Sequence, residues 1–178
     1  MSGLAIDKGI GDGFLEVART LLDRPPEDPP TPAQLRRAAS SLYYALFHTM
    51  CVRFADVLVG ENAEGGLARA WVEVYRGLEH NSCISQCKEL GKRDFPQPAK
   101  VLAGDMQQLH AARISADYDP TYVIDLISLN SLYAMAEKNI AMLKGCTERD
   151  LKALASWMLF KSLGAKRARE SAGLLKPA

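Results

Sequence analysis

The segment from His110 to Ile127, HAARISADYDPTYVIDLI, places groups that could bind an anion between two apolar helical patterns. Arg113 could hold a phosphate or a carboxylate, and Asp117 and Tyr118 follow it by four and five residues. Because residues four apart share a helix face, Asp117 could instead neutralise Arg113. A guanidinium on an inward stripe must be hydrogen-bonded or open to water, since its desolvation is costly. The segment therefore predicts a ligand site or a buried ion pair that fixes the joint between two helices.

A second candidate set lies between residues 32 and 58. Arg37, Ser41, Tyr44 and His48 are spaced i, i+4, i+7 and i+11, which puts them on one face of a helix. Tyrosine and histidine on an apolar helix are most often core residues whose polar tips find partners. The other interpretation is that Arg37 and Tyr44 line a ligand site.

Two arginine and histidine combinations could move protons beside a phosphate. Arg76 and His80, in RGLEH, are four residues apart and would share a helix face. A solvated helix face is the competing interpretation of this pair. Alternatively, His48 could approach Arg113 in space without being near it in sequence. Arg76, His80 and His48 are therefore the candidate catalytic residues.

Three side chains could bind a metal ion. His80, Cys83 and Cys87 would fall on one face of a continuous helix, and both residue types suit zinc. A fourth ligand is missing, however, and Asn81 and Ser82 are expected to interrupt the helix. The sequence has no glycine-rich phosphate loop, no Ser-His-Asp arrangement and no CxxC pair. We expect no metal and no cofactor.

Helices must position these groups, because the apolar period is helical along nearly the whole chain. The proline-rich segment 23–32 ends a first helix, and Thr31 followed by Pro32 caps a long helix to about Leu58. Asp119 and Pro120 predict the start of a later helix, and TERD, at residues 147–150, resembles a capping box. The further helices are expected over about 67–80, 98–113, 120–143 and 148–163, and Asn81 and Ser82 either end the first of these or cap a short helix over CISQCKEL. No strand-like alternation appears, so we predict an all-α antiparallel bundle of about five to six helices.

Length and composition fit one domain of ordinary size. The chain has 178 residues and a formal net charge of +1, so no bulk charge indicates nucleic acid or membrane. We predict a single domain over residues 1–163 and a basic, mobile tail over residues 164–178. Charged residues break up the first 22 positions, and no later window approaches about 18 uninterrupted apolar residues. Four cysteines without a paired framework suit reduced thiols, so the expected location is the cytoplasm, with no membrane contact.

Two motifs resemble a known family. LRRAASSLYYALFH, at residues 35–48, resembles the second helix of HEPN (higher eukaryotes and prokaryotes nucleotide-binding) domains. RISADYDP, at residues 113–120, resembles the Arg-x-x-Ala-Asp-Tyr element of an uncharacterised bacterial branch, and the likeness extends over roughly residues 30–145. It implies a bundle of four or five helices, commonly homodimeric, in toxin–antitoxin, defence or RNA-processing contexts. Many such domains are metal-independent ribonucleases.

The resemblance also implies where a ribonuclease motif should lie. In the family an arginine steadies the phosphate and a histidine, separated from it by four to six residues, transfers protons. After Arg113 those positions hold Tyr118, Asp119 and Pro120, so the motif is broken here.

Three hypotheses follow. The first is a HEPN-like dimer in which five residues line a cleft for a nucleotide, RNA or a protein partner such as an antitoxin. Those residues are Arg37, Tyr44, Arg113, Asp117 and Tyr118. The second is a metal-independent ribonuclease that uses one of the two arginine and histidine pairs. The third is a purely structural dimerisation module.

Overall fold

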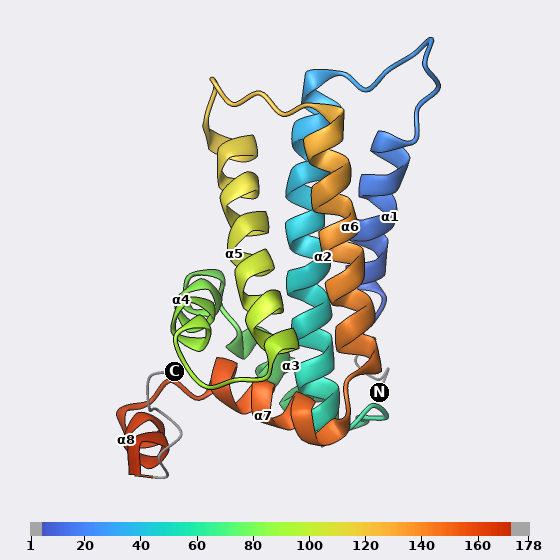
Figure 1. The fold of residues 1–178 in the computed structure, drawn as a ribbon. Helices are drawn as coiled ribbons and strands as arrows, with labels where there is room; N and C mark the ends of the chain where they lie inside the picture. Colours follow the sequence, from blue (N-terminus) through green and yellow to red (C-terminus); the bar gives the residue numbers. More distant parts are fainter. Residues whose placement is uncertain (1–4, 172–178) are drawn as a thin grey trace. The chain divides into compact units, whose positions relative to one another are not determined.

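The computed structural model describes residues 5–171, and these residues form helices and no β-strand. In chain order the helices are α1 (Ile10–Leu22), α2 (Pro32–Val59), α3 (Gly66–Gly77), α4 (His80–Gly91), α5 (Gln97–Tyr118), α6 (Leu126–Gly145), α7 (Glu148–Leu159) and α8 (Leu163–Ser171) (Figure 1). The all-α prediction is confirmed. The predicted count of five to six is wrong, because the described residues hold eight helices. The short segment after residue 79 is a full helix, α4, and a further helix, α8, follows α7.

The chain forms two compact units that both draw on α2 and α5. The second unit consists of Asp7–Met50 and Asp105–Lys144, and so contains α1, α6 and parts of the two shared helices. The first unit takes in Cys51–Gly104 and the described residues from Gly145 onward. Each unit combines segments that are distant in sequence. α2, with 28 residues, is long enough to contribute residues to both units.

Capping and burial explain α2. Gln34 N donates to Thr31 Oγ1 at 3.3 Å and Thr31 N donates to Gln34 Oε1 at 2.8 Å, which is a capping box ahead of the helix. The predicted bounds of this helix are confirmed to within one residue. By length and composition alone, α2 could also cross a membrane. Buried core helices meet the same criterion, and 61% of the most apolar window of α2 is buried.

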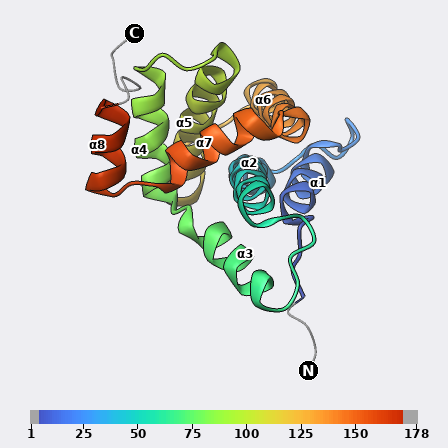
Figure 2. The ribbon, with the colours of Figure 1, turned by 90° about the horizontal axis from the view of Figure 1, so that it is seen from below.

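In the second unit, α1 packs closely on α2 and α6. A Cβ added at Gly11 would lie 2.4 Å from Thr49 Oγ1, so the glycine permits this approach of α1 to α2. Arg19 Nε donates to the Tyr133 hydroxyl at 2.9 Å. Figure 2 shows α1, α2, α5 and α6 nearly along their axes. This packing holds the part of α2 that carries the candidate residues.

The connection between α5 and α6 differs from the prediction. We expected a helix to start at Asp119 and Pro120, but α5 runs to Tyr118 and α6 begins only at Leu126. A residue before proline disfavours helical geometry, so α5 ends there. Asp125 caps α6 instead, because its carboxylate accepts from Ser128 N at 2.7 Å.

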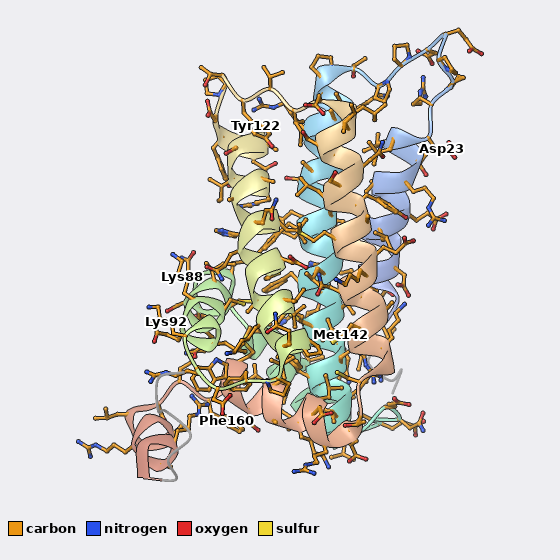
Figure 3. The ribbon with its side chains drawn as sticks, in the orientation of Figure 1. Asp23, Lys88, Lys92, Tyr122, Met142 and Phe160 are labelled. Carbon is orange, nitrogen blue, oxygen red and sulfur yellow. The ribbon has the colours of Figure 1, made fainter. Side chains whose placement is uncertain are left out.

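Arg36 of α2 holds this connection in place. Its guanidinium donates to the carbonyl oxygens of Asp119 and Tyr122, both at 2.8 Å. Figure 3 labels Tyr122 in the segment that joins the two helices. The turn beside Tyr118 is therefore anchored to the N-terminal part of α2, next to Arg37.

In the first unit, α8 is anchored to the end of α7. Arg169 Nη2 donates to the carbonyl oxygens of Ser156 and Phe160 at 2.7 and 2.9 Å, and its guanidinium lies 4.7 Å from the ring centre of Trp157. These bonds tie α8 to carbonyl oxygens at the C-terminal end of α7, where Ser156 O also accepts from Phe160 N. The predicted loss of regular structure after residue 163 is therefore wrong up to Ser171. The rest of the predicted tail, residues 172–178, lies outside the described residues.

Candidate functional site

Arg113 of α5 lies between two tyrosines. Its Nη2 donates to the Tyr44 hydroxyl at 2.8 Å, and its Nε lies 2.9 Å from Asp117 Oδ2. The guanidinium carbon is 5.5 Å from the ring centre of Tyr44 and 5.3 Å from that of Tyr118. Only 18% of the side chain is exposed. The predicted pairing of Arg113 with Asp117 is confirmed.

The carboxylate of Asp117 has two further polar neighbours on α2. Its Oδ1 accepts from the buried Ser40 hydroxyl at 2.5 Å, and Arg37 Nη1 lies 3.9 Å from the same oxygen. Sequence reasoning named Ser41 rather than Ser40. Because α2 is buried on most of its circumference here, its periodicity does not reveal which of two adjacent serines faces α5.

The electrostatics fix the charge of Arg113. Burial lowers the pKa of its guanidinium, but the hydrogen bond to Tyr44 and the negative charge of Asp117 outweigh burial and raise the pKa overall. Arg113 thus stays protonated at any physiological pH. It can stabilise an anion but cannot transfer a proton in a reaction.

Two predicted ligand-binding residues face solvent at this site. Tyr118, the last residue of α5, is 69% exposed, and the side chain of Arg37 is 64% exposed. An aromatic ring and a guanidinium therefore stand beside the buried pair, where a ligand could contact them.

His48 lies in an aromatic cluster of the second unit. Its ring stacks on Phe14 with centres 5.4 Å apart and lies 6.0 Å from the ring of Tyr44. Tyr44 is also the hydrogen-bond partner of Arg113, so His48 and Arg113 contact the same tyrosine. This geometry favours the interpretation of His48 as a half-buried packing residue.

Arg76 and His80 do not share a helix face. α3 ends at Gly77 and α4 begins at His80, and Leu78 and Glu79 between them are extended. The prediction of one helix through His80 is therefore wrong, because the chain breaks after Gly77. Both side chains are exposed, and both belong to the first unit rather than to the one that holds Arg113.

One of the two reasons given against a metal site is wrong. α4 is continuous from His80, so the expected interruption at Asn81 and Ser82 is wrong. However, His80 is exposed whereas Cys83 and Cys87 are buried. Over residues 5–171, no three His, Cys, Asp or Glu side chains are placed to hold a metal ion.

An open groove on the second unit was not foreseen. It has a volume of about 580 Å³ and is lined by α5, α6 and the segment that connects them. Ten large hydrophobic side chains are exposed in the described chain, and five of them come from α5, α6 or the segment between them: Ile114, Tyr118, Val123, Leu126 and Ile127. Of these five, Val123 lines the groove. A signal existed, since Val123 and Ile127 interrupt the polar pattern expected of a solvated turn and helix face.

No protein-family model, curated protein or solved structure matches the chain.

Proposed function

We propose that the protein is a HEPN-like antiparallel bundle that binds a nucleotide or RNA at the Arg113 site. The observation that carries the proposal is the exposed Tyr118 ring over a guanidinium that two partners hold in place. Unstacked bases bind proteins by stacking on aromatic rings and on arginine, and phosphates bind to exposed arginine. Tyr118 would take the base, and Arg37 would take the phosphate.

Substitution of Tyr118 tests this binding. We expect Tyr118→Ala to raise the Kd for a short single-stranded RNA about tenfold, because one stacked base contributes about 1–3 kcal/mol. Fluorescence anisotropy with a labelled oligonucleotide measures the effect. Phe160→Ala is the matched control, since Phe160 is an exposed aromatic residue of the first unit (Figure 3). Equal affinities of wild type and Tyr118→Ala would count against the site.

We further propose that the protein is a homodimer and that the exposed side chains of Val123, Leu126 and Ile127 form its interface. Exposed apolar groups at this density are typical of association surfaces. The one acidic residue between Val123 and Ile127, Asp125, accepts a hydrogen bond from the backbone of Ser128. A two-fold interface sets a surface against itself, so a mostly apolar surface favours a second copy over a charged partner.

A charge on this surface should prevent association. We expect Ile127→Glu to raise the dimer Kd by about a hundredfold, because the carboxylate would be desolvated in the interface. Light scattering coupled to size-exclusion chromatography gives the mass. Leu67→Glu, an exposed leucine of the first unit, should leave the mass unchanged. A wild-type chain that is monomeric at high concentration would refute the dimer.

A metal-independent ribonuclease is the alternative, and His48 with Arg113 would be its catalytic pair, since both contact Tyr44. Arg76 and His80 support it less, because they lie on different helices. We also propose a bacterial setting and an antitoxin-like partner, which the HEPN resemblance implies, and the cytoplasmic location that the four cysteines suggest.

A further inference from the structure

The donors around Asp117 form the kind of site that proteins use to bind a free anion. Arg113 Nε is 2.9 Å from one carboxylate oxygen, and Ser40 Oγ bonds the other. Arg37 Nη1 stands 3.9 Å away. The three groups come from two helices, α2 and α5. Arginine and hydroxyl donors that converge in this way suit phosphate and carboxylate oxygens, yet the anion here belongs to the chain.

Two features make this internal anion replaceable. Asp117 is the penultimate residue of α5, where the helix ends and its last carbonyls lack helical partners. The carboxylate can leave the donors by rotation of its own side chain, while Arg113 keeps its bond to Tyr44. In addition, Arg37 is largely exposed, so an incoming anion meets a cation before it meets Asp117.

We propose that Arg37, Ser40 and Arg113 form a phosphoryl-binding site that Asp117 occupies in the resting chain, and that a phosphoryl ligand binds by displacing this carboxylate. The inference rests on the proposed function only in taking the ligand to be phosphorylated. A phosphoryl group replaces the carboxylate because it brings three acceptor oxygens and more negative charge. Asp117 thereby competes with incoming anions for the same donors, and anions that bind weakly do not displace it.

The test compares two variants that each remove one negative charge. Inorganic phosphate is titrated calorimetrically into the wild type, Asp117→Asn and Asp119→Asn. We expect Asp117→Asn to bind phosphate about tenfold more tightly than the wild type, since the internal competitor is gone. Asp119→Asn should stay within about twofold, because the Asp119 side chain bonds Thr121 and not the arginines. Adding Arg113→Gln to Asp117→Asn should abolish the gain.

Phosphate affinity of Asp117→Asn equal to or below that of the wild type would overturn the proposal. An equal gain in Asp119→Asn would also overturn it, because the effect would then be general electrostatics. Asp117→Ala is a second variant in case the amide disturbs Ser40, and circular dichroism checks that each variant folds.

Two further ligands separate the sources of the phosphoryl group. If Asp117→Asn binds adenosine monophosphate more tightly than phosphate, and Tyr118→Ala removes the difference, the displacing group comes from a nucleotide. If Asp117→Asn binds adenosine monophosphate and phosphate equally well, the displacing group is free phosphate. Either of these two results supports displacement of the carboxylate. Failure of the proposed function would appear separately, as a wild type that does not bind RNA although Asp117→Asn gains phosphate affinity.

Discussion

Gly11→Ala is expected to lower the free energy of unfolding by about 1–3 kcal/mol, the usual cost of overpacking a tight contact. The added Cβ would lie 2.4 Å from Thr49 Oγ1 and 3.0 Å from the Ala45 carbonyl oxygen. The second of these atoms is backbone, so side-chain rotation alone cannot relieve the clash. α1 must therefore shift away from α2, which would also disturb the packing of Phe14 on His48.

Gly13→Ala is the matched control for this substitution. Gly13 lies in the same helix, but nothing is within 4 Å of an added Cβ there. The alanine should stabilise the helix by up to about 1 kcal/mol, the difference in helix propensity. Chemical denaturation of the two variants measures both effects. Equal stabilisation by the two alanines would show that α1 does not approach α2 as closely as described.

The second large effect is expected for the pair of Arg113 and Asp117. Removing either partner leaves the other one poorly solvated, since their side chains are only 18% and 22% exposed. We expect Arg113→Ala to lower the free energy of unfolding by about 2 kcal/mol, less than the full cost for a wholly buried pair. A double-mutant cycle with Asp117→Ala should give a coupling energy of about 1–2 kcal/mol.

Glu148 and Lys152 of α7 provide the comparison for this cycle. They are also four residues apart on a helix, but their side chains are 73% and 51% exposed. Their coupling energy should be only about 0.3–0.5 kcal/mol, because water screens exposed pairs. Thermal and urea unfolding of the two cycles gives both energies. A coupling for Arg113 and Asp117 as small as that of the α7 pair would show that burial does not strengthen it.

Local signals in the sequence predicted some helix ends and missed others. Thr31 followed by Pro32 marks the start of α2, and the Thr147 side chain caps α7 as expected. At the start of α6, however, Asp119 with Pro120 and the later Asp125 are both plausible caps. The choice depends on contacts between segments distant in sequence, above all those of Arg36 with the connection, and local reasoning does not contain them.

The candidate site was predictable to the same extent. Spacing along one helix predicted the pair of Arg113 and Asp117, because both residues lie on α5. The contact with Tyr44 and the contribution of Ser40 depend on how α2 packs against α5, which periodicity does not fix. The pairing of Arg76 with His80 failed for the opposite reason, since it assumed a continuous helix where the chain is extended.

One incubation tests most directly whether the Arg113 site binds RNA without cleaving it. A labelled single-stranded RNA is equilibrated with wild-type protein in a buffer containing a metal chelator, and the sample is divided between a native gel and a denaturing gel. We predict a shifted complex on the first gel and full-length RNA on the second, with the shift lost in Tyr118→Ala. Unshifted RNA, or fragments that disappear in a folded His48→Ala variant, would contradict the proposed binding function.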